Sequence, residues 1–319
     1  MRDIDAPRPG PDELVVQVGS VGICGTDLSI HAGKIPVAYP RVMGHEIVGV
    51  ARTGGGEIRE GERVLVDPGI ACGRCRQCRE GRTNICTAGW LVGRDRDGGL
   101  REEMTVPVTN VHQLPTGLDP STAPMLQVLA TCAHAQRRTE VFPGESVVVL
   151  GLGVTGLLHL QLATLRGAGP VIGITRSEAK LALARDLGAD RTIAADGTEA
   201  ARLAEVLPGG ADLVIECVGT VAAFGEAMAM VRTGGRILAY GTMTETSGEL
   251  PFYELYHKEI SVIGARSARV EDFPFAIDAV ASGRIELDPL VSGRHPLDAV
   301  EDAMRAAAAP GALKVFVDV

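Results

Sequence analysis

The chain has 319 residues, enough for two domains of roughly 100–200 residues each. Its formal net charge is −9 and only 3% of its residues are aromatic, so neither a basic face nor a stacking surface for nucleic acid is indicated. No apolar run reaches the roughly 18 residues that a membrane-spanning helix needs, and residues 1–11 lack the apolar segment of a signal peptide. We therefore expect a cytosolic protein whose seven cysteines serve metal binding or catalysis rather than disulfides.

The first third of the chain has the pattern of short strands interrupted by glycine and proline. Strands are expected at Leu14–Val18, Glu46–Val50 and Arg63–Val66. Short strands separated by turn signals are typical of a partly open β-barrel. We place this first domain at residues 1–125.

The middle of the chain alternates between strand and helix patterns. A helix is expected at Ser121–Arg138, followed by the apolar strand Ser146–Leu150. The expected elements that follow are Leu157–Arg166, Val171–Thr175, Glu178–Leu187, Leu213–Glu216, Ala222–Val231 and Arg236–Tyr240. This alternation predicts a doubly wound parallel sheet, which we place at residues 126–263.

The pattern changes again after residue 263. Helices are expected at Phe273–Ser282 and Pro296–Ala308, and a closing strand at Ala312–Val317. We treat residues 264–319 as a third segment of the chain.

Four cysteines form a C-x2-C-x2-C-x7-C cluster at Cys72, Cys75, Cys78 and Cys86. Four thiolates at this spacing can surround one tetrahedral Zn²⁺, and a four-sulfur site has no open position, so its role would be structural. An iron–sulfur cluster can use similar spacing, but the fourth cysteine is not followed by proline and no other electron-transfer signal is present.

Cys24 and His45 are candidates for a second metal site. Cys24 begins the C-G-T-D segment at 24–27, which we expect to form a turn after a strand. A catalytic zinc uses a few protein ligands and keeps one position open, and a thiolate and an imidazole suit it. Taken singly, a buried cysteine is more often a small apolar side chain, and a histidine beside a glutamate is often a surface ion pair. The pairing gains weight from the neighbouring motifs.

These motifs together carry a resemblance. The order C-G-T-D at 24–27, G-H-E at 44–46, the four-cysteine cluster and a glycine-rich turn after an apolar strand resembles the zinc-containing medium-chain dehydrogenase family. The similarity runs from about residue 12 to the C-terminus. It implies a GroES-like catalytic domain, to which residues 264–319 return, and a Rossmann cofactor domain. Relatives carry an extra strand before the segment matching 7–18, so we expect a missing first strand or a start assigned late.

The resemblance also implies roles for the residues around the second metal site. Cys24 and His45 would bind a catalytic zinc, and Glu46 would bind it or exchange with water beside it. The family's further ligand, usually Cys or Glu, falls on Gln127 here; because an amide carbonyl is a weak zinc ligand, Glu46 can take its place. Cys132, five residues on, is expected to pack in the core.

A proton relay is implied at Thr26, whose hydroxyl can both donate and accept a hydrogen bond. A turn-stabilising threonine is the alternative. The family often carries a relay histidine five residues after the cysteine, but this chain has Ser29 there and His31 two residues later. We leave open which of the two continues the relay.

A dinucleotide-binding loop is expected where Gly151, Leu152, Gly153, Val154 and Gly156 form part of a G-x-G-x-x-G motif. The motif is weak alone, but an expected strand precedes it and an expected helix follows it, as this binding mode requires. The turn, the approach of the pyrophosphate and the packing of helix on strand each need one glycine.

The end of the next strand bears on the choice of cofactor. An NAD site usually has an acidic residue about 20 residues after the motif, where this chain has Thr175, Arg176 and Ser177. An arginine can meet a 2′-phosphate, so NADP(H) is favoured over NAD(H), although Arg176 could simply face solvent. Val218, Gly219 and Gly241 end later strands and are expected to line the nicotinamide side.

The prediction is therefore a zinc-dependent oxidoreductase with two zinc ions per chain, acting on a secondary alcohol, polyol, sugar or cyclitol, or the matching ketone. The alternatives are a zinc-free quinone or enoyl reductase and a non-enzymatic binding protein on the same fold. The first would lack both cysteine-containing clusters. We expect a small-molecule substrate and, from the family, a homodimer or homotetramer.

Overall fold

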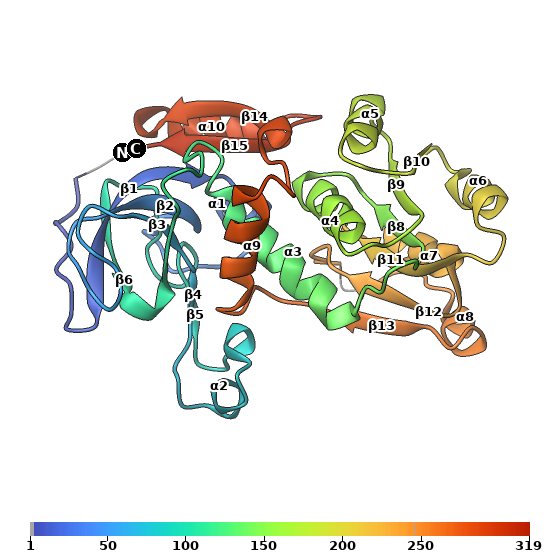
Figure 1. The fold of residues 1–319 in the computed structure, drawn as a ribbon, viewed down its shortest axis with the longest axis horizontal. Coiled ribbons are helices and arrows are strands. Elements are labelled where there is room, and N and C mark those ends of the chain that lie inside the picture. Colours follow the sequence, from blue (N-terminus) through green and yellow to red (C-terminus); the bar gives the residue numbers. More distant parts are fainter. Residues whose placement is uncertain (1–2, 246) are drawn as a thin grey trace. The chain divides into compact units, whose positions relative to one another are not determined.

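A computed structural model describes residues 3–245 and 247–319 (Figure 1). The chain divides into two compact units. Unit 1 comprises residues 1–131 and 267–319, and unit 2 comprises residues 132–266. The domain limits given above, at 125/126 and 263/264, stay predictions.

Unit 1 is built on a mainly antiparallel sheet with the strand order β14-β15-β1-β2-β3-β7, and β6 also pairs with β1. Its strands are β1 (Glu13–Gly22), β2 (Glu46–Ala51), β3 (Arg63–Val66), β4 (Gly69–Ile70), β5 (Trp90–Leu91), β6 (Glu103–Pro107), β7 (Val111–Gln113), β14 (Val291–Pro296) and β15 (Lys314–Asp318). Its helices are α1 (Gly25–His31), α2 (Arg76–Arg79), α9 (Asp272–Ala281) and α10 (Val300–Ala308). The α2 segment, with the β4–β5 hairpin, projects from the sheet as a small lobe (Figure 1).

Strand β1 is central to unit 1 because it pairs with three neighbouring strands. Its first half, Glu13–Gln17, pairs with β6, and its end, Ser20–Gly22, pairs with β15. An irregularity between Val18 and Ser20 interrupts its pairing with β2. A bulge of this kind bends and twists a strand. As a result, the β1–β2 register places Gly22 opposite Glu46, so the segments that follow β1 and precede β2 lie together.

Unit 2 contains a parallel sheet with the order β10-β9-β8-β11-β12-β13. Its strands are β8 (Val147–Leu150), β9 (Val171–Thr175), β10 (Arg191–Ala194), β11 (Ala211–Glu216), β12 (Val231–Ala239) and β13 (Ser261–Gly264). Its helices are α4 (Val154–Leu165), α5 (Glu178–Asp186), α6 (Glu199–Val206), α7 (Val221–Met230) and α8 (Phe252–His257), and α3 (Met125–Thr139) runs into it from unit 1. The order reverses between β8 and β11, and ligands of such sheets bind at the carboxyl ends of the strands.

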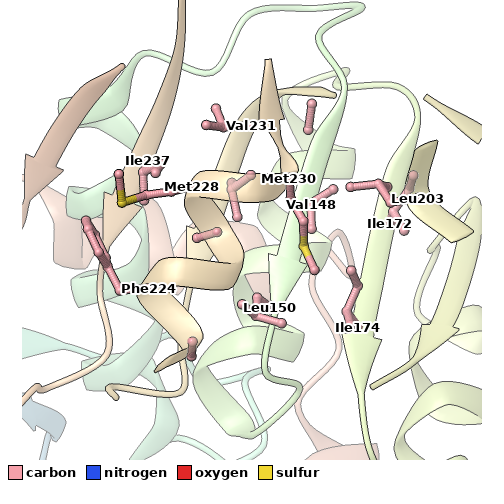
Figure 2. Packing of buried hydrophobic residues seen from close by; sticks show 14 of the residues in the cluster. Val148, Leu150, Ile172, Ile174, Leu203, Phe224, Met228, Met230, Val231 and Ile237 are labelled. Carbon is pink, nitrogen blue, oxygen red and sulfur yellow. The ribbon is translucent and has the colours of Figure 1, made fainter. Parts of the chain in front are cut away.

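The core of unit 2 explains the apolar runs of its central strands. Val148 and Leu150 on β8, with Ile172 and Ile174 on β9, share one face of the sheet with side chains of α7 (Figure 2). The alternate residues of β8 are also fully buried, on the opposite face. Strands covered on both faces show continuous rather than alternating hydrophobicity. The predicted doubly wound sheet is therefore confirmed.

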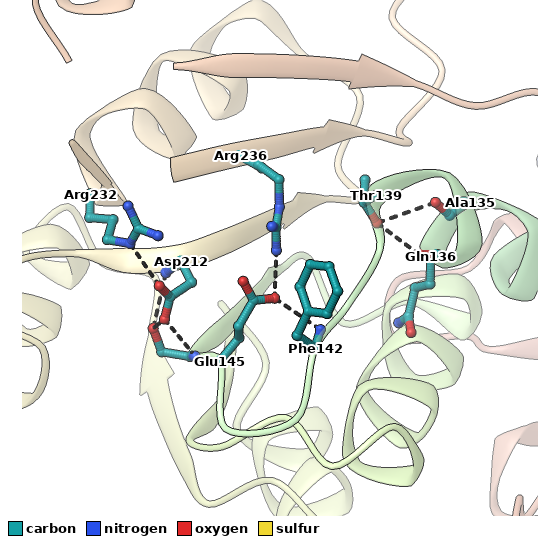
Figure 3. Close-up of polar contacts among 9 residues, drawn as sticks. Ala135, Gln136, Thr139, Phe142, Glu145, Asp212, Arg232 and Arg236 are labelled. Atoms are coloured by element: carbon teal, nitrogen blue, oxygen red, sulfur yellow. Dashed lines mark hydrogen bonds and ion pairs between the residues drawn. The ribbon is translucent and has the colours of Figure 1, made fainter. Parts of the chain in front are cut away.

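Charged pairs close the amino ends of these strands. Asp212 accepts hydrogen bonds from Ser146 Oγ at 2.6 Å and from Arg232 Nε at 2.7 Å, and Glu145 accepts one from Arg236 (Figure 3). These side chains join the beginnings of β8, β11 and β12. At their carboxyl ends, the same strands continue into loops.

The structure corrects three local predictions. The C-G-T-D segment, read as a turn, begins helix α1 at Gly25. The helix expected from Ser121 begins at Met125, after a series of turns. The helix expected from Pro296 begins at Val300, because Pro296 still belongs to β14.

Asp67, directly after β3, gives unit 1 an expected pH dependence. Burial, opposed by the Gly69 N–H and assisted by Asp272, raises the pKa of Asp67 to about 7. An acid whose folded pKa is raised stabilises the fold below its unfolded pKa of about 3.9 and loses that contribution as pH rises to the folded pKa. Between pH 5 and 8 the wild type is expected to lose roughly 3 kcal/mol of unfolding free energy through this group. Asp67→Asn should remove this part of the slope in urea denaturation; an unchanged slope would contradict it.

Candidate functional site

Cys24, His45 and Glu46 form one of two metal-ligand clusters in the described chain. Their ligand atoms all lie within 4.8 Å of one another, and His45 and Glu46 are buried. Cys24 follows β1 and precedes α1, whereas His45 and Glu46 lie at the start of β2. The antiparallel pairing of β1 with β2 is what brings together residues separated by some twenty positions in the chain.

Asp27 holds the two ligand-bearing segments in place, a role that the sequence reasoning missed. Its Oδ2 accepts the Cys24 N–H at 2.9 Å, and its Oδ1 accepts the Gly44 N–H at 3.1 Å. Oδ1 also lies 3.6 Å from His45 Nδ1. A carboxylate that orients a metal-binding imidazole through its second nitrogen is a recurrent arrangement. With Nδ1 turned to Asp27, Nε2 is the ring nitrogen free to bind a metal.

The charges around His45 favour a cation. Burial alone would lower the pKa of His45, but the negative charges of Asp27 and Cys24 outweigh it and raise that pKa well above its usual range. Burial would raise the pKa of Asp27, and the charge of His45 overcomes it, so the pKa of Asp27 is lowered. One thiolate, one imidazole and one carboxylate beside a further carboxylate therefore fit Zn²⁺ in their chemistry and in their charge.

Lys314, on β15, is the second residue that the sequence reasoning missed. It is 4% exposed, and its Nζ donates to both oxygens of Glu46 at 2.7 Å and to the carbonyl of Ile23 at 3.1 Å. Glu46 itself is fully buried. The carboxylate is thus shared between the metal-ligand cluster and a buried ammonium group.

The relay candidates lie on α1. Thr26 Oγ1 is 3.8 Å from Cys24 Sγ. Ser29 and His31 both line a groove of about 540 Å³ between α1 and α10, together with Lys34 and Arg305. Gln127 is 8% exposed in the first turn of α3. The roles of all these residues stay predictions.

The second cluster joins the four cysteines of the lobe, namely Cys72, Cys75, Cys78 and Cys86, whose sulfurs lie within 4.8 Å of one another. Cys75 Sγ is 3.5 Å from Cys78 Sγ and 3.8 Å from Cys86 Sγ. A disulfide would need about 2.05 Å, whereas a tetrahedral Zn²⁺ with bonds near 2.3 Å separates its sulfurs by about 3.8 Å. The spacing thus fits a shared metal.

Backbone N–H groups favour a negatively charged thiolate in this lobe. The N–H groups of Cys78 and Thr87 lower the pKa of the Cys75 thiol, while burial and the neighbouring sulfurs raise that of Cys78. Several thiols this close cannot all ionise unless a cation lies among them. The donor set therefore fits a four-sulfur zinc site.

In unit 2 the glycine-rich loop joins β8 to α4. Gly151 has φ +92°, a value that favours glycine, and a Cβ at Gly156 would lie 1.9 Å from the Gly151 carbonyl oxygen. Gly153 is the N-cap of α4, which begins at Val154, and Leu152 is buried. Close packing of helix on strand and a helix N-terminus with free N–H groups suit a pyrophosphate.

The end of β9 carries no acid. Thr175 is its last residue, Arg176 is exposed with no hydrogen-bond or ion-pair partner in the described chain, and Ser177 is the N-cap of α5. The carboxyl ends of β11 and β12 are followed by Val218, Gly219 and Gly241. Val218 is 50% exposed although it is apolar.

Comparison with known proteins agrees with these geometries. A family model for the alcohol dehydrogenase GroES-like domain matches residues 10–116, and one for zinc-binding dehydrogenases matches residues 154–282. L-galactonate-5-dehydrogenase of Escherichia coli K12 is 35% identical over 92% of this chain and 87% of its own length. The chain belongs to the zinc-containing medium-chain dehydrogenase family. The predicted fold class, GroES-like domain plus Rossmann domain, is confirmed.

Two further proteins are similar to this dehydrogenase over most of their length. Sorbitol dehydrogenase of Halalkalibacterium halodurans is 30% identical over 98% of the chain and 93% of its own length. A Sinorhizobium meliloti 1021 structure, named as a zinc-binding dehydrogenase bound to NADP, superposes with a TM-score of 0.93 at 35% identity, covering 100% of this chain and 95% of that one. The protein is thus an enzyme, an alcohol or polyol dehydrogenase.

No helix within residues 3–245 and 247–319 is both long enough and apolar enough to cross a membrane.

Proposed function

We propose that this dehydrogenase oxidises a secondary hydroxyl of a polyol or sugar acid to the ketone, or catalyses the reverse, with NADP(H) as the hydride carrier. The observation that carries the proposal is the Cys24–His45–Glu46 cluster with Asp27 behind it, an open ligand set on a fold whose other unit has a dinucleotide loop. Relatives named for L-galactonate and sorbitol support the substrate class.

We propose that the chain binds two zinc ions, one at each ligand set. Cys24, His45 and Glu46, with Gln127 as a further candidate, would hold a catalytic zinc, and the four cysteines of the lobe would hold a structural one. When bound, the catalytic metal supplies Lewis-acid polarisation of the substrate oxygen, and the nicotinamide ring supplies the hydride acceptor.

The chain's own residues supply orientation and proton transfer. Asp27 fixes the His45 ring, and Lys314 holds Glu46. Thr26 accepts the hydroxyl proton and passes it toward Ser29 or His31, which line a groove open to solvent. A relay that ends at such a groove can exchange its proton with water.

The cofactor preference rests on Arg176, an exposed guanidinium with no partner in the described chain, at the strand end where an NAD site usually has an acid. Arg176→Ala is expected to weaken NADPH binding by roughly 10–100-fold, as loss of a charged hydrogen bond does, and to leave NADH binding nearly unchanged. Fluorescence titration of both cofactors measures this. Arg191→Ala, an exposed arginine at the start of β10, is the matched control. Equal affinities in wild type and Arg176→Ala would overturn the preference.

We also propose that two or four copies assemble, with β13 as a contact. This edge strand of the unit 2 sheet follows α8 in the chain, and in α8 Phe252, Tyr253 and Tyr256 are 67%, 68% and 79% exposed. Exposed aromatic side chains beside an open strand edge are typical of an association surface. Sedimentation velocity should give a dimer or tetramer for the wild type and a smaller species for Tyr253→Ser/Tyr256→Ser. A monomeric wild type would refute the assembly.

We propose a cytosolic location as well, because none of the seven cysteines is paired in a disulfide.

A further inference from the structure

Glu216, the last residue of β11, is a buried carboxyl that the proposed mechanism does not use. Its exposed fraction is 0%. Oε1 accepts the N–H of Val218 at 2.6 Å and the N–H of Gly219 at 2.8 Å. One carboxyl oxygen therefore fixes the backbone of the loop that joins β11 to α7.

The same residue also holds the loop that follows β12. The carbonyl oxygen of Glu216 accepts the N–H groups of Tyr240 at 3.0 Å and Gly241 at 2.8 Å. A Cβ at Gly241 would lie 2.9 Å from Glu216 Oε2 and 2.3 Å from the Gly219 nitrogen. The carboxyl thus lies packed between two loops, and only glycine at 241 leaves room for it.

A third loop is reached through Val218. A Cβ at Gly151, the first glycine of the glycine-rich loop, would lie 2.7 Å from Val218 Cγ2. Glu216 therefore connects the loops after β8, β11 and β12. In a doubly wound sheet these are the loops that surround a bound dinucleotide.

The environment of the carboxyl suits a rigid bracket between the loops. Burial raises the pKa of Glu216, although the N–H groups of Gly219 and Val218 oppose the shift. Oε2 is buried with no hydrogen-bond partner in the described chain. Meanwhile Val218, fixed by a short hydrogen bond, presents an apolar side chain that is half exposed. A rigid loop that exposes an apolar side chain is pre-organised for a ligand.

We propose that Glu216 is a positioning residue for the nicotinamide half of the cofactor, acting through the backbone of Val218, Gly219 and Gly241. The inference rests on the proposed function, because it assumes that unit 2 binds a nicotinamide dinucleotide. The adenosine half would be held at the end of β9, which lies two strands from β11, so the two halves should respond differently to a change at Glu216.

The test compares whole and half cofactors on the full-length, metal-loaded enzyme. Isothermal titration calorimetry would measure the affinities of NADPH, 2′,5′-ADP and reduced nicotinamide mononucleotide. The proteins compared would be the wild type, Glu216→Ala, Glu216→Asp and Glu216→Gln. Alanine has no carboxyl group and aspartate has a shorter side chain, so both variants should lose the hydrogen bonds from the N–H groups of Val218 and Gly219. We expect roughly 10–100-fold weaker binding of NADPH and of the mononucleotide, with 2′,5′-ADP unchanged. Turnover at saturating cofactor should fall as well.

Glutamine is the conservative variant, because it has the same length as glutamate and its Oε1 can accept both N–H groups. Glu216→Gln should therefore retain most of the NADPH affinity. Glu226→Gln is the matched control: this carboxyl on α7 is close enough to Glu216 for their charges to interact, and it has no hydrogen bond in the described chain.

The outcomes separate the two proposals. Wild-type NADPH affinity in both Glu216→Ala and Glu216→Asp would overturn the role of Glu216 alone. Equal weakening of NADPH and 2′,5′-ADP would also overturn it, because the effect would then be general loss of structure. A wild type that binds neither ligand would refute the cofactor assignment itself, and the inference about Glu216 with it.

Discussion

Replacing Cys24 with serine is expected to abolish turnover while nucleotide binding persists. A hydroxyl is a much poorer zinc ligand than a thiolate, so the cluster with His45 and Glu46 should lose its metal. A bound metal contributes several kcal/mol to stabilising the developing charge, so the rate should fall at least about a thousandfold. Metal analysis should show zinc per chain falling from about two to about one. NADPH titration of the same sample should give an unchanged affinity.

The control for this experiment is Cys132→Ala, which removes a thiol outside both clusters. Its zinc content should equal that of the wild type. Full activity in Cys24→Ser would rule out the proposed catalytic metal site. A wild type with one zinc per chain, retained in Cys24→Ser, would leave the four-cysteine lobe as the metal site and reopen the mechanism.

The second large effect is expected for Lys314→Met. Removing the ammonium group leaves the fully buried Glu46 carboxylate without its ion-pair partner. Loss of one member of a buried pair costs about 3–5 kcal/mol of unfolding free energy, because the remaining charge is uncompensated. Urea denaturation of the chelator-treated protein should show this loss. With zinc bound, the loss should be smaller, because the metal can take over the freed carboxylate.

A double variant separates the effect of the buried charge from the effect of the lost lysine stem. Lys314→Met/Glu46→Gln leaves no buried charge at this position, so it should recover most of the stability lost in Lys314→Met. If the double variant is as unstable as the single one, packing of the lysine stem, and not its charge, accounts for the effect. An unchanged unfolding free energy in Lys314→Met would contradict the buried ion pair.

Some features could be predicted because their information is local. The spacing of Cys72, Cys75, Cys78 and Cys86 is short enough for the loop itself to bring four sulfurs together, and the structure places them so. The strand at Val171–Thr175 was predicted with the bounds that the structure shows. Continuous apolar runs between turn signals reflect burial on both faces, and that is a property of each strand's own sequence.

Elements with weaker local signals were misplaced or overlooked. The segment that begins α1 looked like a turn because of its glycine and threonine, yet Asp27 accepts the N–H of Cys24 and so caps the helix. Strand β14 and helix α8 were not predicted. The side chains of β14 are half-buried or exposed, and those of α8 are largely exposed, so no apolar period marks them.

From the sequence by itself the fold class, the four-cysteine lobe and the glycine-rich loop could be predicted, because each depends on local periodicity or on residue types at short spacing. The proposal that Cys24 and His45 bind one metal rested on the family resemblance, because these residues are 21 positions apart. Only the tertiary structure decided what surrounds those residues. Lys314 is 268 positions from Glu46, and Glu216 holds a loop 25 residues further along the chain. Such contacts follow from strand register and sheet order, and a buried charge reveals its partner only when the chain has folded around both.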